Sequence, residues 1–199
     1  MKFLKENSYD IIRLIINQVG ITIFAFVIYT AVGSVKIESR LAVILLRVGI
    51  SVFSALFYYA LIYTVAWDWG AKDKIRIDAG RIPADKFKGL KMSLIANVPN
   101  FVLAFLYVLT FGIYALGVEG IKNFAFIFNF LARFWMAIYL GAIQGAFIMF
   151  ENNENLYFFM QGIGYLIIPV ISVFVTHLGY TLGSREKRMF GFLKRSKQA

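Results

Sequence analysis

The sequence predicts an all-α integral membrane protein: a single membrane domain, residues 1–199, folded as a polytopic bundle of four or five transmembrane helices. The first observation is a set of long apolar blocks with few charges. These blocks cover residues 19–35, 41–67, 92–116, 124–150 and 156–182. A run of about 18 apolar residues is enough to cross the roughly 30 Å hydrocarbon core as a helix. The second observation is composition. The chain is 60% apolar and 16% charged, whereas a soluble domain is about half apolar and about a quarter charged.

The first two blocks are predicted spans with distinct ends. Residues 1–18 combine charged side chains with a run of Ile and Leu, which is typical of an amphipathic helix lying at the interface before the chain enters the bilayer. The first span follows and ends near Gly33. The second span ends in a group of aromatic side chains that we expect at the membrane–water interface. This group comprises Tyr58, Tyr59, Tyr63, Trp67 and Trp69.

Residues 68–91 form the only substantial polar segment between blocks, and we expect a basic cytosolic loop there. The alternation of charged and apolar residues at 74–78 favours an extended piece, and Gly80 supplies a turn. Residues 83–92 have a helical pattern with a proline in the first turn. Three Asp residues lie among the cations, but the neighbouring positive charges oppose a metal site, and the spacing is not that of a calcium-binding loop.

Polar residues interrupt the third and fourth blocks. Pro99 removes a backbone hydrogen-bond donor, so the third span is expected to begin near Phe101. Arg133 lies inside the fourth block, where a charge at the centre of a transmembrane helix costs a few kcal/mol. Two alternatives follow: the fourth block is re-entrant or interfacial, or it crosses fully and Arg133 is paired inside the bundle. The fifth block crosses and leads into a basic cytosolic tail, residues 183–199.

The distribution of Lys and Arg favours the irregular fourth block. If all five blocks cross, the two sides of the membrane receive equal numbers of basic residues, which leaves the orientation undetermined. If the fourth block enters and returns on one side, most basic residues fall on the side of both termini. Because Lys and Arg bias loops toward the cytoplasm, we expect a multi-pass protein of the plasma membrane with both termini cytoplasmic. The net charge of +10 then indicates anionic lipids of the bilayer, and not nucleic acid, as the partner.

The candidate ligand- or lipid-binding residues are Arg133, Arg47 and Gln144. Arg133 leads because charges inside the membrane usually mark a functional site, and an anionic ligand or lipid headgroup is what a guanidinium would bind. The alternative is an arginine that snorkels, or that packs against amides and carbonyl groups. Arg47 lies near a span end, where snorkelling is the simpler account. His177, the single histidine, has no carboxylate in its own block and is expected to be a packing residue.

Candidate docking residues for a membrane or cytosolic protein partner, or for anionic lipid, lie in the predicted loop. They are Arg76, Arg81, Lys86, Lys88 and Lys91. The alternative is a solvated loop whose charges only set the topology. Two glycine pairs, at positions 141 and 145 and at positions 179 and 183, have the small-residue spacing that lets membrane helices approach closely, within or between chains.

The sequence predicts a non-catalytic protein that needs no cofactor or metal. The chain has no cysteine, and it contains no zinc-protease, phosphate-loop or serine-hydrolase motif. A catalytic triad or a proton relay would have to use the only histidine. We expect a subunit or accessory of a membrane complex, such as a transport complex, that docks through the loop and the tail. The alternative is a self-contained carrier or channel for a small or anionic solute, with Arg133 as the contact.

Overall fold

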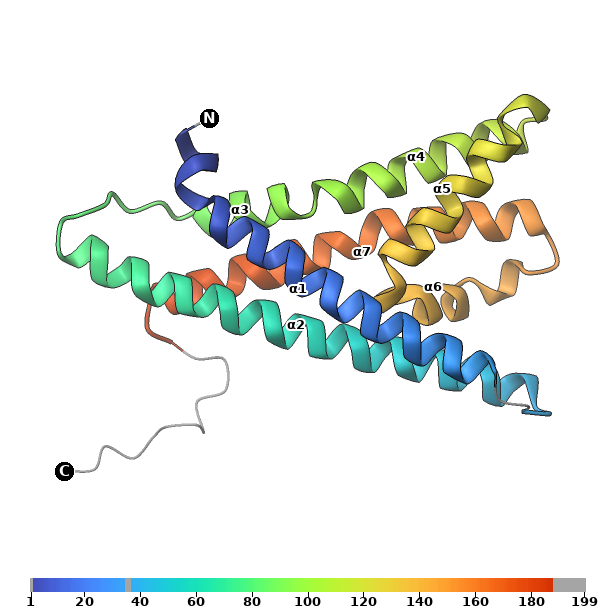
Figure 1. The fold of residues 1–199 in the computed structure, drawn as a ribbon, viewed down its shortest axis with the longest axis horizontal. Helices are drawn as coiled ribbons and strands as arrows, with labels where there is room; N and C mark the ends of the chain where they lie inside the picture. The colour runs from blue at the N-terminus through green and yellow to red at the C-terminus, as the bar shows by residue number, and fades with distance from the viewer. Residues whose placement is uncertain (1, 35–36, 188–199) are drawn as a thin grey trace.

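The computed structural model of the chain describes residues 2–34 and 37–187 (Figure 1). All regular elements in these ranges are helical. The α-helices are α1 (Lys2–Gly33), α2 (Arg40–Asp78), α3 (Lys88–Ala96), α4 (Val98–Ala115), α5 (Lys122–Trp135), α6 (Leu140–Ala146) and α7 (Glu154–Gly183). Three short 3-10 turns lie at Glu119–Ile121, Ala137–Tyr139 and Ile148–Phe150. The all-α prediction is confirmed for the described residues, whereas residues 188–199 of the predicted tail lie outside them.

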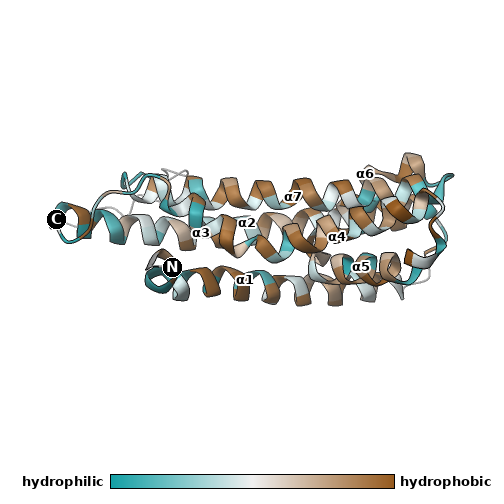
Figure 2. Cartoon of the chain, turned by 90° about the horizontal axis from the view of Figure 1, so that it is seen from above, coloured by the Kyte–Doolittle hydropathy of each residue, from teal (hydrophilic) through white to brown (hydrophobic). Residues whose placement is uncertain are grey.

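Helices α1, α2 and α7 run the length of the bundle, α3 and α4 together do the same, and the short helices α5 and α6 fill part of it (Figure 1). The start of α1 and the end of α7 lie at one end of the bundle, which we call the terminal end (Figure 1). The start of α5 and the end of α6 lie at the opposite end, which we call the hairpin end (Figure 1). Helices α1, α2, α4 and α7 are each long and apolar enough to cross a membrane. Hydrophobic residues predominate along the helices, and hydrophilic residues are most frequent toward the two ends (Figure 2).

The fourth apolar block is broken into a hairpin. Helix α5 stops at Trp135, and the chain turns by 81° before it continues as α6. Because α5 runs inward from the hairpin end and α6 runs back to it, the block does not cover the full length of the bundle (Figure 1). The irregularity that the sequence predicts for this block is therefore present in the fold.

Side chains from other helices complete the hydrogen bonding at this break. The carbonyl oxygen of Trp135 accepts a hydrogen bond from the Thr22 hydroxyl at 3.2 Å. In the first turn of α6, the backbone N–H of Gly141 donates to Ser51 Oγ at 2.7 Å. A helix interrupted inside an apolar bundle leaves backbone groups that water cannot reach, so such side-chain partners are required.

The predicted loop 68–91 is mostly helical, and the extended piece expected at 74–78 is wrong. Helix α2 continues to Asp78, and ion pairs one turn apart, Lys72–Asp68 and Lys74–Asp78, each 2.7 Å long, stabilise this last part. A five-residue alternation is too short a signal to outweigh the continuation of a long helix. The helix predicted for 83–92 begins only at Lys88. The true loop covers residues 79–87.

Two other boundaries differ from expectation. The interfacial lead predicted for residues 1–18 is the first half of the continuous helix α1, and its Ile11 and Leu14 are buried in the bundle. The third block divides at Asn97, where α3 ends and α4 begins, and Pro99 occupies the first turn of α4. A proline is tolerated in a first turn because its missing N–H has no helical partner there. The span thus begins slightly before the predicted Phe101.

Helices α2 and α7 share the largest interface of the bundle. A Cβ atom added at Gly183 of α7 would collide with the backbone of Trp67 in α2, and one at Gly141 of α6 would collide with the backbone of Arg47. Glycine permits this close approach because it has no side chain. Both glycine pairs seen in the sequence therefore serve packing within the chain.

Candidate functional site

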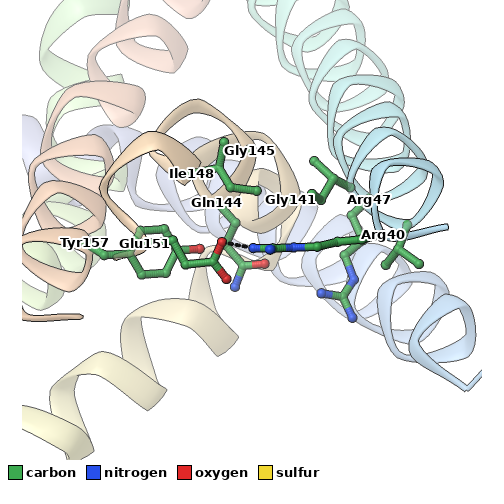
Figure 3. A pocket seen from close by; sticks show the side chains of 10 residues that line it. Arg40, Arg47, Gly141, Gln144, Gly145, Ile148, Glu151 and Tyr157 are labelled. Carbon is green, nitrogen blue, oxygen red and sulfur yellow. Dashed lines mark hydrogen bonds and ion pairs between the residues drawn. The ribbon is translucent and has the colours of Figure 1, made fainter. Parts of the chain in front are cut away.

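An open pocket of about 230 Å³ lies at the hairpin end. The first two turns of α2 form one wall, α6 forms the floor, and the segment that leads into α7 forms the opposite wall (Figure 3). The charged and polar side chains of its lining are Arg40, Arg47, Gln144, Glu151 and Tyr157. Two of the three predicted ligand-binding residues, Arg47 and Gln144, therefore meet in one pocket, although 97 positions separate them in the chain.

Arg47 is held at the pocket by an aromatic ring and by neighbouring polar groups. Its guanidinium lies 5.2 Å from the centre of the Tyr29 ring in α1, a cation–π contact. The Tyr29 hydroxyl donates a short hydrogen bond to Gln144 Oε1 and so links α1 to α6. The Nε of Arg47 is buried and has no hydrogen-bond partner. An incompletely paired guanidinium at a pocket wall is a ready donor to an anion.

Arg133 lies beside the pocket without lining it. The residue sits in the last turn of α5, donates to Gln161 Oε1 at 2.9 Å and lies 5.0 Å from the centre of the Phe158 ring. The sequence left two alternatives for this block: an irregular path, or a full crossing with Arg133 paired inside the bundle. The structure combines parts of both, because the block is bent and Arg133 is paired inside the bundle with an amide instead of a carboxylate. Its Nε is also buried without a partner.

The two arginines form one positive region. The charges of Arg47 and Arg133 both act on the hydroxyl groups of Tyr29 and Tyr157. Within the described residues, neither guanidinium has a salt bridge to a carboxylate. Unpaired charge is costly in a region of low dielectric constant. The site can therefore gain free energy by binding an anion, and oxyanions match the planar fork of a guanidinium.

One carboxylate approaches this positive region. Glu151 forms an ion pair with Arg40 across the mouth of the pocket (Figure 3). The side chains of Arg40 and Glu151 are 72% and 47% exposed, so water screens the pair. The pair joins the first residue of α2 to the turn that follows the hairpin.

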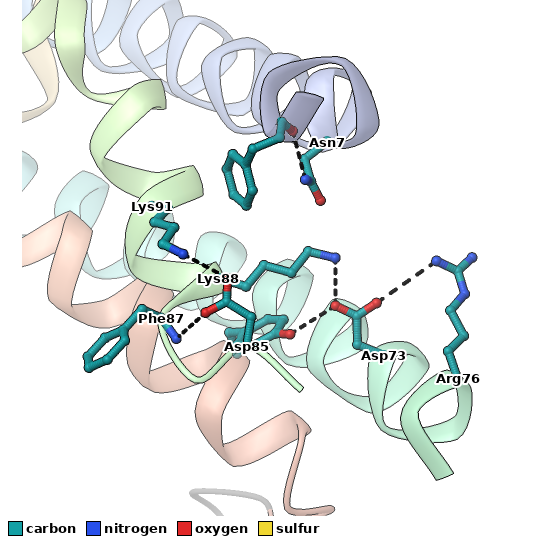
Figure 4. A network of polar contacts seen from close by, with 9 residues as sticks. Asn7, Asp73, Arg76, Asp85, Phe87, Lys88 and Lys91 are labelled. Atoms are coloured by element: carbon teal, nitrogen blue, oxygen red, sulfur yellow. Dashed lines mark hydrogen bonds and ion pairs between the residues drawn. The ribbon is translucent and has the colours of Figure 1, made fainter. Parts of the chain in front are cut away.

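The predicted docking cations at the terminal end do not form a free patch. Lys88 pairs with Asp73 at 2.7 Å, Lys91 pairs with Asp85 at 2.9 Å, and Arg76 lies 3.9 Å from Asp73 (Figure 4). The remaining two candidates, Arg81 and Lys86, are exposed on the loop 79–87. Three of the five cations are thus paired with carboxylates, and one of them, Lys88, joins α3 to α2.

Asp85 organises the start of α3. It accepts a hydrogen bond from the backbone N–H of Phe87 at 2.9 Å and one from the Lys91 ammonium. Burial alone would raise the pKa of Asp85, but these hydrogen bonds and the charges of Lys91 and Lys88 outweigh it. The pKa of Asp85 is therefore held below its usual value of 3.8.

Asp73 is a polar residue whose role sequence reasoning missed. Its carboxylate is buried in α2, where it accepts hydrogen bonds from Lys88 in α3 and from the Tyr180 hydroxyl of α7 at 2.9 Å. It borders a second open cavity of about 350 Å³, between the first part of α1 and the last part of α2. Asp73 lies in the segment that the sequence predicts to be a loop, whereas in the structure this segment continues α2. The ion pairs one turn apart were the available signal.

A second missed cluster joins the two interruptions of the helices. Asn100 of α4 forms two hydrogen bonds with Gln18 of α1 and accepts another from the Trp135 indole at 2.7 Å. The Oδ1 atom of Asn97 accepts hydrogen bonds from the Asn100 amide at 2.7 Å and from the Ser172 hydroxyl at 2.9 Å. Every member is buried or half-buried and paired, so the cluster fastens α1, α4, α5 and α7 to one another.

Two other features bear on the chemistry of the site. The ring of His177 stacks on Phe87, with ring centres 6.4 Å apart, in agreement with a packing role. In the described ranges, no group of three or more His, Cys, Asp or Glu residues is arranged to hold a metal ion.

The comparisons with known proteins add no relative. No protein-family model, no curated protein and no solved structure matches the chain. The geometry is therefore the basis for assigning the pocket of Arg47 and Gln144, with Arg133 beside it, as the candidate functional site.

Proposed function

We propose that this chain is an integral membrane protein of the plasma membrane with four crossings and one re-entrant hairpin. Helices α1, α2, α4 and α7 would cross, and α5 with α6 would enter from the outer face and return to it. The length and hydropathy of the four helices support this topology. The concentration of basic residues in the loop 79–87 and around it supports a cytoplasmic terminal end.

The function that we propose is that of a non-catalytic carrier for a substrate with an anionic group, which binds in the pocket at the hairpin end. The observation that carries this proposal is the pair of guanidinium groups, Arg47 in the lining of a polar pocket and Arg133 beside it, neither of which has a carboxylate partner among the described residues. Interrupted helices support it as well, because membrane carriers build their substrate sites where helices are broken. The hypothesis that the sequence ranked second thus becomes the first.

Movement of an anion through reconstituted protein tests the carrier proposal. We would insert the purified chain into phosphatidylcholine vesicles and follow the transfer of two probes, radiolabelled inorganic phosphate and a fluorescent phosphatidylglycerol. The proposal expects transfer of at least one probe. It also expects loss of that transfer in Arg47→Gln, with normal transfer in Arg185→Gln, which removes an exposed positive charge at the other end. Equal transfer by wild type, Arg47→Gln and protein-free vesicles would refute it.

A subunit of a membrane complex stays as the second candidate. Its support is the group of exposed cations at the terminal end, Arg81, Lys86, Arg185 and Lys187. Purification from the native membrane in mild detergent, followed by mass spectrometry, tests it. A stoichiometric protein partner that is lost when Arg81 and Lys86 are changed to Glu would favour this candidate over the carrier.

A further inference from the structure

We propose that the anionic group is the phosphate of a membrane lipid, and that Glu151 occupies the place of that phosphate on Arg40 until the lipid displaces it. This inference rests on the proposed function, because it names the substrate class and the regulation of the same pocket. Its three supports are the depth of the pocket, the apolar surface beside it and the ion pair at its mouth.

The pocket covers the depth of a lipid headgroup. Arg40 is the first residue of α2, and Arg47 is seven positions further along the same helix. At 1.5 Å per residue, the two guanidinium-bearing positions are separated by about 10 Å along the axis. Tyr157 lies within the first turn of α7 on the opposite wall. The headgroup layer on one side of a bilayer is about 5–8 Å thick, so a phosphate in this layer can reach both arginines.

Apolar side chains lie directly beside the arginines of the pocket. Val43 and Ile44 of α2 and Ile148 of the opposite side line the same pocket. Met149, the next residue in the 3-10 turn Ile148–Phe150, is exposed. A free phosphate ion needs no such surface, whereas the acyl chains of a lipid need one directly beside the headgroup site. The juxtaposition therefore favours a lipid over a soluble anion.

Glu151 competes with the lipid phosphate for the guanidinium of Arg40. Its carboxylate pairs with Arg40 across the mouth of the pocket (Figure 3). A phosphate accepts two parallel hydrogen bonds from a guanidinium, as a carboxylate does, and the exposed pair is weak enough to exchange. Glu151→Gln would free Arg40 and remove a negative charge that repels the phosphate. An exposed ion pair contributes up to about 1 kcal/mol, which corresponds to about a fivefold change in affinity.

Lipid binding to five versions of the full chain, wild type and four variants, tests this inference. Each would be placed in phosphatidylcholine nanodiscs that contain an increasing fraction of phosphatidylglycerol, and bound lipid would be counted by native mass spectrometry. We expect wild type to bind phosphatidylglycerol in preference to phosphatidylcholine. Glu151→Gln should reach half-saturation at about a fivefold lower fraction. Glu154→Gln is the matched control, because it removes a nearby negative charge that does not line the pocket, and it should resemble wild type.

Arg47→Gln should lose the preference, and Arg47→Lys should keep part of it if charge alone contributes. Unchanged or weaker binding by Glu151→Gln would overturn the role of Glu151. Inorganic phosphate that stabilises the protein in pure phosphatidylcholine nanodiscs, and that displaces phosphatidylglycerol, would overturn the lipid assignment and leave the anion site intact. If wild type and Arg47→Gln bind both probes equally while circular dichroism shows the same helix content, the proposed function itself fails together with this inference.

Discussion

Asp73 provides the most direct test of how α2, α3 and α7 are held together at the terminal end. Its carboxylate is 5% exposed, and it accepts hydrogen bonds from the Lys88 ammonium at 2.7 Å and the Tyr180 hydroxyl at 2.9 Å. Removing one member of a buried ion pair costs about 3–5 kcal/mol, because the other charge loses its partner. Lys88 is 19% exposed, so water solvates part of the freed charge. We therefore expect Asp73→Asn to lower the free energy of unfolding by about 2–3 kcal/mol.

The matched control for this change is Asp68→Asn. Asp68 lies on the same helix and pairs with Lys72 at the same distance, 2.7 Å, but these side chains are 50% and 60% exposed. Exposed pairs contribute about 0–1 kcal/mol, so the control should be nearly neutral. The assay is unfolding of the full chain in dodecyl maltoside micelles by increasing fractions of dodecyl sulfate, followed by circular dichroism.

A double variant separates burial of charge from loss of a hydrogen bond. In Asp73→Asn combined with Lys88→Gln, no ammonium is left without a partner, and the amide of residue 73 still accepts from Tyr180. We expect this variant to recover part of the lost stability. The reasoning is refuted if Asp73→Asn costs no more than Asp68→Asn, or if the effects of the two single changes simply add.

Three further predictions concern topology, packing and pH. Because the chain has no cysteine, single cysteines at Asn153 and Arg81 should react with an impermeant maleimide from opposite faces of the membrane, and reaction of both from one face would reject the proposed topology. Gly183→Ala should destabilise the chain by about 1–3 kcal/mol, because its Cβ would collide with the backbone of Trp67. Gly49→Ala, with open space around it, should be neutral or stabilising in the same unfolding assay, and equal effects would contradict the packing argument. Since the folded pKa of Asp85 is lowered from 3.8, its contribution is fully present above that pH and is lost as the pH falls through the folded pKa. The stability difference between wild type and Asp85→Asn should shrink below about pH 4, and a difference that grows there would have the wrong sign.

The helices were predictable wherever one physical property dominated a long segment. Each of the five apolar blocks predicted a helix, because a long apolar run with few charges has few other stable structures. All five blocks contain helix in the structure. The irregular fourth block was predictable too, since Arg133 inside it and the balance of basic residues opposed a simple span. The end of α2 was not predictable by the same means. Its last residues are charged, and the ion pairs that keep them helical depend on side chains one turn apart.

The candidate site was predictable in its parts and not in its assembly. Arg133, Arg47 and Gln144 were notable because polar groups in apolar blocks are costly. Their mutual placement depends on the bend at Met136, which returns α6 to the hairpin end and puts Gln144 opposite Arg47. Asp73 does not lie in an apolar block, so its position in the sequence did not mark it as unusual. A carboxylate among many cations is expected to be solvated, and only the structure shows that this one is buried.

Local composition by itself determined the helical class, the number of long apolar segments and the concentration of positive charge near the termini. These properties follow from how many consecutive residues avoid water and from which charges flank them. The tertiary structure alone decided which polar groups meet. It paired Lys88, Lys91 and Arg76 with carboxylates, and it left the Arg47 guanidinium at a pocket with the Arg133 guanidinium beside it. The reason is that pairing of buried charges depends on distances between helices, and those distances are set by packing between segments far apart in the chain.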